Sequence, residues 1–364
     1  MKRRWRRPLA VGVLAGQLGY LLFASFGEDF WAQYLVARVL TGRLSVEGAL
    51  EVWPYPHGYD NLAFEALLAL PLSFLPPVPA LLGWTALSAA FLALAVYLLR
   101  RMFRLQPIGS GEAILLSLAW PVTFVALFRG QISTLVVLSL AGALALAGRR
   151  RPFLGGLAAS LVLAKPHLWL GLAAGLLARS RWRLAIGLGI GSGVLLLVSL
   201  PAAAAGLTVP DPERFFTTWF FSNPLSVSLV GRLHFLPWPV QAAASLLGLL
   251  AVALWWWRRR EESASAAGFA WVGYLIFTPH LRVYDLVVLL PVILAALPWQ
   301  SRWAQAGLIL TSIGAIGSLR FQALDLVAIG LVCIAVALWS GMSPTRSPGE
   351  NPGTAPGGRA ESAR

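Results

Sequence analysis

The chain has 364 residues, of which 58% are hydrophobic and only 12% are charged. Soluble domains carry about 25% charged residues, so this composition excludes an ordinary soluble protein and indicates an integral membrane protein. The formal net charge of +14 would suit a nucleic-acid binder, but the arginines cluster in short connections between apolar stretches, where they act as topology signals. We therefore expect no nucleic-acid partner.

Apolar stretches of a length that suits a membrane recur along the chain. The first follows a basic N-terminus that resembles a signal peptide but lacks a small-residue cleavage site, so we interpret it as a retained helix. The sequence predicts an all-α multi-pass membrane protein with about twelve transmembrane helices. The predicted spans are 8–26, 78–99, 112–128, 131–148, 153–164, 167–178, 184–201, 237–257, 265–279, 284–298, 303–319 and 322–340.

The arginine clusters give this topology a direction. With both termini in the cytoplasm, most of the 29 basic residues fall on the cytoplasmic side. Two long connections, 27–77 and 202–236, then lie on the outer side. The apolar but short segment Asp60–Pro77 is interpreted as a juxtamembrane or re-entrant outer helix, which must be buried in protein if it enters the membrane.

The domain organisation is simple. Residues 1–342 are predicted to form one transmembrane domain, and the Pro- and Gly-rich tail 343–364 is predicted to be disordered. The single cysteine, Cys333, excludes a disulfide within the chain and argues against a metal cluster.

Polar residues gather on the predicted outer face, at the ends of successive spans. Ionisable residues at such positions indicate a functional site. They occur in five short motifs: Glu28 and Asp29 in GEDFWAQY, Arg129 and Gln131 in FRGQIS, Lys165 and His167 in AKPHLW, Asn223 in FSNPLS, and His280, Arg282, Tyr284 and Asp285 in FTPHLRVYD. Cations beside aromatic residues at membrane depth suit a ligand with a phosphate head and an apolar tail.

Several of these residues also have purely structural interpretations. Asp29 precedes a helix-like stretch and could be its N-cap, and Arg129 could extend to the membrane interface. His167 and His280 each follow a proline and could be hydrogen-bonded turn residues, whereas Asp285 could pair with Arg282 one helical turn away. Lys165 is harder to explain structurally, because its burial without a partner is costly.

The order of these motifs, together with the YP of WPYPHGYDN, resembles the bacterial glycosyltransferase family 87, whose members are polyprenol-phosphate-mannose-dependent mannosyltransferases with the GT-C membrane fold. The resemblance extends from about Gly27 to Pro291. One departure concerns Tyr55, since family members often have YPP where this chain has YPHGYDN.

The resemblance implies an inverting glycosyltransferase that moves a sugar, with mannose the first candidate, from a polyprenyl phosphate to a lipid or glycan hydroxyl. The reaction would occur at the outer face of a bacterial plasma membrane, among membrane lipids, with no cofactor and no metal. The implied general base is Asp29, with Glu28 the less favoured neighbour, and His280 lies near the donor phosphate.

The residues themselves indicate further roles at such a site. Arg129, Lys165, His167 and Arg282 are the candidates for holding the donor phosphate. Candidate substrate contacts are Glu28, Gln131, Tyr55, Asn223, Tyr284 and Asp285. The alternative function is a multi-pass transporter or flippase for a phosphate-bearing lipid. Such proteins usually contain internal repeats and a site near the bilayer midplane, and neither is evident in the sequence.

Overall fold

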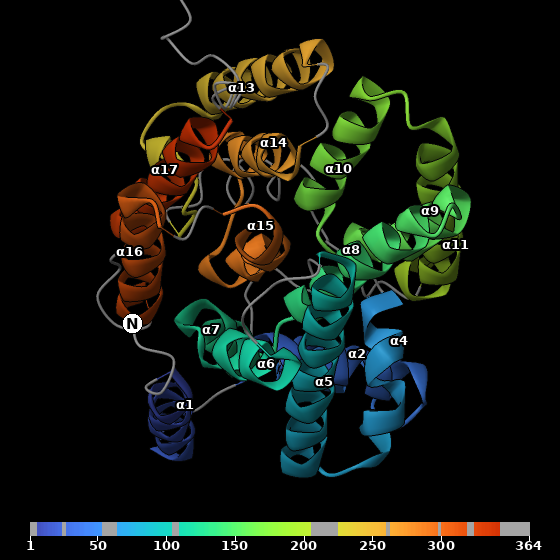
Figure 1. Cartoon of the computed structure of the whole chain (residues 1–364). Helices are drawn as coiled ribbons and strands as arrows, with labels where there is room; N and C mark the ends of the chain where they lie inside the picture. Colours follow the sequence, from blue (N-terminus) through green and yellow to red (C-terminus); the bar gives the residue numbers. More distant parts are fainter. Residues whose placement is uncertain are drawn as a thin grey trace, which may run out of the picture.

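The computed structural model describes residues 6–23, 27–52, 64–103, 109–204, 225–259, 263–297, 300–318 and 324–342. Every regular element in these ranges is a helix (Figure 1). In chain order they are α1 (Arg6–Phe23), α2 (Glu28–Leu40), α3 (Val46–Glu51), α4 (Phe64–Ala69), η2 (Leu70–Phe74), α5 (Pro77–Phe103), α6 (Ser110–Ala119), α7 (Pro121–Arg129), α8 (Ser133–Gly148), α9 (Pro152–Ala159), η3 (Ser160–Ala164), α10 (Pro166–Ala178), α11 (Trp182–Ala204), η5 (Gly231–Leu233), α13 (Trp238–Arg258), α14 (Ala264–Phe277), η6 (Val283–Leu289), α15 (Leu290–Ala295), α16 (Arg302–Ser318) and α17 (Leu324–Ser340).

Apolar helices dominate the architecture. Three helices of the described ranges are long and apolar enough to cross a membrane: α5, α11 over Trp182–Leu200, and α13. Seven apolar helical segments of 10–17 residues accompany them. The all-helical, apolar fold is therefore confirmed, whereas the number of about twelve crossings stays a prediction.

The predicted span 112–128 is not one straight helix. It consists of α6 and α7, which meet at an angle of 66°. Trp120 between them has an extended backbone (φ −66°, ψ 127°), since the ring of Pro121 disfavours helical geometry in the preceding residue. The predicted span 284–298 is also irregular, because it begins as the 3₁₀ helix η6 before α15 continues.

The predicted outer connection 27–77 is folded against the bundle. Phe30 and Tyr34 of α2 are buried, and the Phe30 ring lies 5.5 Å from that of Trp84 on α5. Short helix α4, within the segment predicted to be juxtamembrane or re-entrant, contributes the fully buried Glu65. Helix α4 is thus largely buried in protein, whereas Pro71 and residues 74–77 are exposed, so the re-entrant placement of this segment stays a prediction.

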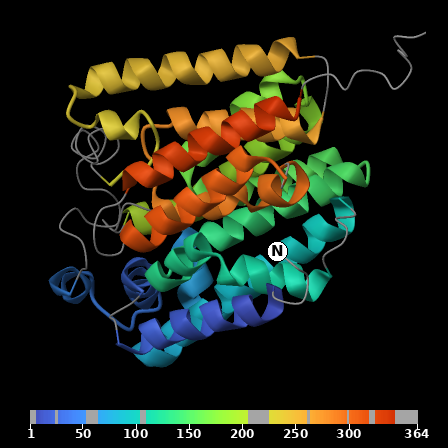
Figure 2. The same ribbon diagram turned by 60° about the vertical axis from the view of Figure 1, so that its left-hand side comes forward.

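The longer helices lie side by side along one common direction (Figure 2). Helices α8, α10 and α14 connect two ends of this bundle. We call "site end" the end at which α8 and α10 begin and α14 finishes, near Ser133, Pro166 and Phe277. We call "arginine end" the opposite one, at which Gly148, Ala178 and Ala264 lie and where the turns carry arginines.

Candidate active site

The first acidic motif and the RGQ turn pack directly against each other at the site end. The Gly27 amide donates to the Phe128 carbonyl (2.8 Å), and the Trp84 indole donates to the Gly130 carbonyl (2.8 Å). Gly130 ends α7 with φ +71°, and a Cβ at this position would lie 2.6 Å from the Cβ of Phe30. Only glycine allows both this positive φ and this close approach of Phe30. Gly130 therefore lets the start of α2 pack beside the end of α7.

The two adjacent acids have different surroundings. Glu28 forms an ion pair with Arg129, and both side chains are partly exposed, at 52% and 34%. Asp29 lies in the first turn of α2, but the N-cap residue is Gly27 and no side chain caps the helix. Asp29 is therefore not the N-cap, although its charge is favourable near a helix N-terminus. Its carboxylate also acts electrostatically on Lys165.

A buried polar network lies beside this contact. The Lys165 ammonium donates to Gln131 Oε1 (2.6 Å) and lies 3.3 Å from Asp285 Oδ1. Asp285 is fully buried and also accepts from the Ser133 hydroxyl (3.1 Å) and from the Arg282 amide (3.1 Å). Asp285 thus contacts the side chains of Lys165 and Ser133, and the hydrogen bond from Arg282 comes from its backbone. This network joins the RGQIS, KPH and LRVYD motifs.

Both site histidines lie next to this network. Nε2 of His167 is 3.5 Å from Asp285 Oδ2, and the rings of His167 and His280 are 5.4 Å apart at an angle of 69°. The Lys165 ammonium lies 5.0 Å from the centre of the Tyr284 ring, within cation–π range. The histidines are therefore part of a shared cluster and not isolated turn residues.

A serine of the second long connection holds the loop that carries His280. The Ser226 hydroxyl donates to the Pro279 carbonyl (3.0 Å) and accepts from the Leu281 amide (3.1 Å). The Val227 amide donates in turn to the Leu281 carbonyl (2.7 Å). Because these bonds bracket His280 on both sides, its ring has a fixed backbone support.

Electrostatics distinguish the cation from the histidine. Burial acts to lower the pKa of the Lys165 ammonium, but the neighbouring anions, with Asp285 the strongest, outweigh it and raise this pKa above its ordinary value. Burial, together with Arg282 and His167, lowers the pKa of His280 well below its ordinary value. At neutral pH the site therefore contains a charged lysine and a neutral His280.

The site contains residues that the sequence analysis did not assign to it. Glu65 on α4 is fully buried, accepts from Gln33 Nε2 (3.3 Å) and acts electrostatically on Lys165. Ser133 and Ser226 support Asp285 and the His280 loop. Ser133 lies within the RGQIS motif and could have been noticed there, but Glu65 comes from an apolar segment in which only tertiary packing reveals its neighbours.

The structure thus brings most of the predicted residues to one end of the bundle. Glu28 contacts Arg129. A second set of residues is connected by described contacts: Gln131, Lys165, His167, His280, Arg282, Tyr284 and Asp285. Asp29 acts electrostatically on Lys165 and Tyr284. Tyr55 and Asn223 lie outside the described residues. Within the described ranges, no three His, Cys, Asp or Glu side chains form a group that could hold a metal ion.

This arrangement can carry out two chemical tasks. A partly exposed carboxylate at Asp29 can accept a proton from a hydroxyl group. The cations around it can stabilise a developing negative charge, and they are most effective where water is excluded.

Comparison with known proteins identifies the family of this chain. No curated protein and no solved structure matches the chain. The model of glycosyltransferase family 87 matches residues 63–279, which is more than half of the 364 residues. The matched segment includes Arg129, Gln131, Lys165 and His167, whereas Asp29, His280 and Arg282 lie outside it. The protein therefore belongs to glycosyltransferase family 87 and is a glycosyltransferase with apolar membrane helices.

Proposed function

We propose that this protein is an inverting glycosyltransferase that moves mannose from a polyprenyl phosphate to a hydroxyl of a lipid or glycan acceptor. The observation that carries this proposal is the juxtaposition of the partly exposed acids of α2 with the buried Lys165 network. A phosphate donor needs cations, and a hydroxyl acceptor needs a base. Both are present at the site end. The family match favours this enzyme over a transporter or flippase.

The proposed reaction is a single displacement. Asp29 accepts the proton of the acceptor hydroxyl, and the oxygen attacks the anomeric carbon from the face opposite the phosphate. The bond between the anomeric carbon and the phosphate oxygen breaks, and the polyprenyl phosphate leaves with the electron pair. A positioned base of this kind contributes on the order of 10²–10⁴-fold to the rate. A single displacement inverts the configuration of the sugar.

The leaving phosphate is held by cations that are already oriented. Lys165 is fixed by Gln131 and Asp285, so its ammonium needs no reorganisation when charge develops nearby. Neutral His280 donates one hydrogen bond to the same phosphate. Arg129 binds the phosphate in place of the Glu28 carboxylate, which is its partner in the absence of donor. Arg282 and His167 complete the phosphate site.

The fold and location belong to the same proposal. We propose a GT-C type bundle of about twelve transmembrane helices in a bacterial plasma membrane, with both termini cytoplasmic and the site end outside. The arginines at the opposite end support this orientation. In intact cells, a membrane-impermeant maleimide should label Val52→Cys, an exposed residue after α3, but not Arg149→Cys at the arginine end. The reverse pattern would contradict the orientation.

A reconstitution experiment tests the reaction. The full chain in detergent should transfer radiolabelled mannose from polyprenyl-phosphate mannose to a lipid extract, and the product should have the opposite anomeric configuration from the donor. Transfer should persist in a chelator such as EDTA, because the proposed chemistry needs no metal. A chain that used a nucleotide-linked mannose and not the lipid-linked one would overturn the donor assignment.

A further inference from the structure

A large cavity in the described part of the chain lies away from the candidate site. It has a volume of about 1380 Å³ and lies among α8, α10, α11, α13 and α14. Its apolar wall includes Leu170, Leu249, Leu250 and Trp271, and four arginines line its end: Arg150, Arg179, Arg181 and Arg183. The cavity exceeds the ~300–1,000 Å³ that is usual for pockets of drug-sized ligands. Its size and lining therefore suit a large ligand with an apolar part and one charged end.

The arginines belong to two tight turns at the arginine end. Arg150 lies between α8 and α9 with φ +61°, and Ser180 lies between α10 and α11 with φ +51°. The Arg179 guanidinium lies 4.2 Å from the centre of the Trp256 ring and donates to the Arg259 carbonyl, so the second turn is tied to the end of α13. These turns bring cations from separate helix pairs to one cavity mouth.

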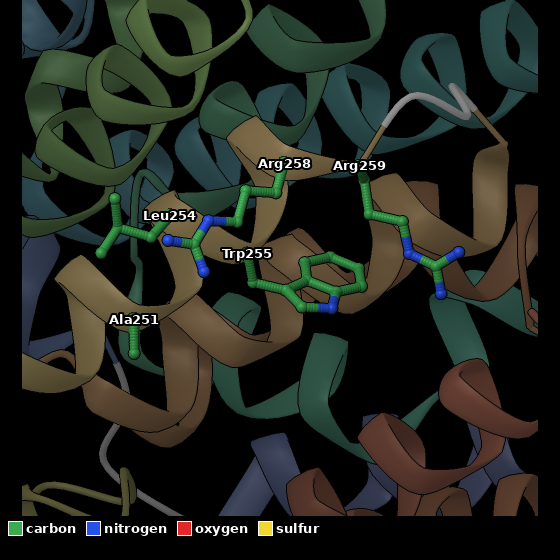
Figure 3. A pocket seen from close by; sticks show the side chains of 5 residues that line it. All are labelled: Ala251, Leu254, Trp255, Arg258 and Arg259. Carbon is green, nitrogen blue, oxygen red and sulfur yellow. The ribbon is translucent and has the colours of Figure 1, made fainter.

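Helix α13 carries a second hollow on its opposite face. This hollow has a volume of about 540 Å³ and is lined by Ala251, Leu254, Trp255, Arg258 and Arg259 (Figure 3). In Figure 3 the two arginine side chains extend in different directions, with Trp255 between them. The last turn of α13 thus adds positive charge at the arginine end, outside the lining of the larger cavity.

No carboxylate is among the residues that line the larger cavity in the described part of the chain. This differs from the site end, where Glu28, Asp29, Glu65 and Asp285 accompany the cations. The described lining of this cavity thus carries a positive charge that suits an anionic ligand. Arg–phosphate contacts are charge-assisted and stronger than neutral hydrogen bonds.

The apolar walls of the cavity indicate the chemistry of the uncharged part of the ligand. Leu246 and Leu250 of α13 line the cavity and are 67% and 51% exposed, so the cavity opens on an apolar face of the bundle. In a membrane protein this face meets acyl chains. Basic pockets between transmembrane helices are known to bind anionic lipid head groups.

We propose that this cavity is a binding site for an anionic phospholipid of the membrane. Its phosphate lies among Arg150, Arg179, Arg181 and Arg183, and its acyl chains follow the groove between α10 and α13 towards Tyr274. The site is distinct from that of the sugar donor, because the 13 residues of α10 separate the arginines from Lys165 by a rise of about 20 Å.

Lipid titration of the full chain tests the charge selectivity. The protein in detergent is titrated with phosphatidylglycerol or with phosphatidylcholine of the same acyl chains, and bound lipid is measured by native mass spectrometry. We expect phosphatidylglycerol to bind at least tenfold more tightly. Equal affinity for the two lipids would overturn the proposal.

A pair of variants on one turn then locates the phosphate. Arg150→Gly removes a lining arginine at a position whose positive φ suits glycine, so the fold is kept. It should weaken phosphatidylglycerol binding about fivefold, since one arginine near an anionic lipid contributes about 1 kcal/mol. The matched control Arg149→Gln removes the same charge from the same turn, outside the cavity lining, and should change the affinity less than twofold. Equal effects of the two variants would contradict the assigned location.

A second pair tests the acyl-chain groove. Gly175 lines the cavity, and a Cβ there would meet nothing within 4 Å, so the side chain of Gly175→Leu starts in open space beside the groove. The control Gly189→Leu adds the same side chain to open space on α11. We expect only Gly175→Leu to reduce bound phosphatidylglycerol. If this variant instead lost binding of added polyprenyl phosphate and kept that of phosphatidylglycerol, the groove would belong to the donor tail and the proposal would be wrong.

Discussion

The two ends of the bundle differ in the burial and the surroundings of their positively charged side chains. At the site end, Lys165 is 7% exposed and its charge is balanced by Asp285. At the arginine end, Arg150 and Arg183 are exposed, and no carboxylate lines their cavity in the described part of the chain. A buried cation must be paired because desolvation is costly, whereas an exposed one needs no partner. The cation is therefore preorganised by a buried ion pair at the site end, whereas Arg150 and Arg183 are exposed at the arginine end.

The largest expected effect concerns Asp29, the proposed general base. Asp29→Asn should lower kcat by roughly 10²–10⁴-fold, since the proposed base can no longer accept a proton. Steady-state transfer from polyprenyl-phosphate mannose measures this loss. The affinity for the donor, measured by native mass spectrometry, should change by less than about twofold, because the proposed phosphate site remains. Turnover near that of the unmodified chain would remove Asp29 from the mechanism.

The buried ion pair provides the next test of the comparison. Lys165→Met leaves Asp285 buried without its cation and should lower the free energy of unfolding by about 3–5 kcal/mol. Arg183→Met at the arginine end is the control and should change it by less than about 0.5 kcal/mol. Denaturant titration of both variants in the same detergent measures the difference.

The double variant Lys165→Met with Asp285→Leu sharpens this result. It removes both charges, so part of the lost stability should return, while transfer should be lost because the proposed phosphate-binding cation is missing. Equal stabilities of Lys165→Met and Arg183→Met would mean that burial does not distinguish the two ends.

The contact between the α2 start and the RGQ turn should be intolerant of a methyl group. Gly130→Ala introduces a Cβ 2.6 Å from Phe30 and a strained φ of +71°, and should destabilise the protein by about 2–3 kcal/mol. Gly142→Ala in α8 meets only an ordinary contact at 3.9 Å and should be neutral or slightly stabilising. Thermal unfolding compares the two, and an unchanged midpoint for Gly130→Ala would contradict the described contact.

A smaller effect is expected where an acid competes with the donor. Glu28→Gln removes the carboxylate that holds Arg129, so the donor phosphate should bind more easily and the KM for donor should fall about two- to fivefold. The kcat should stay nearly constant, since Glu28 is not the proposed base. Glu47→Gln, an exposed acid on α3, should alter neither constant. A loss of kcat in Glu28→Gln would show that Glu28 takes part in the chemistry.

The smallest effect tests the turns at the arginine end. Ser180 has a φ of +51°, so Ser180→Gly should relieve strain and raise the free energy of unfolding by about 0.5–1 kcal/mol. Ser265→Gly, within α14, should have the opposite sign. A destabilised Ser180→Gly would contradict the backbone conformation described for this turn.

Much of the fold and the site could be predicted from local sequence. The apolar spans, the arginine clusters and the motifs at helix ends need only composition and spacing to be recognised. The order of the motifs predicted the family that the comparison then confirmed over residues 63–279. Most of the predicted site residues also lie together at one end of the described bundle.

Pairings between distant residues could not be predicted in this way. The sequence left open a pair between Asp285 and Arg282 one helical turn away. In the structure Asp285 accepts from the Arg282 amide, and its carboxylate lies 3.3 Å from the Lys165 ammonium. It likewise offered Asp29 as an N-cap, but the N-cap of α2 is Gly27, two residues earlier. Helical spacing describes neighbours within one element and contains no information about the element that packs against it.

The sequence by itself therefore determined that this protein is an apolar, all-helical chain whose polar residues lie at helix ends. The composition and the order of residues suffice for this, because apolar stretches are buried and charges are costly in an apolar medium. Only the tertiary structure decided that Glu65 joins the site, that Glu28 holds Arg129 while Asp29 acts on Lys165, and that the turns of Arg150 and Ser180 share one cavity. These outcomes depend on which helices pack together, because a buried charge is stabilised by partners that are distant in sequence.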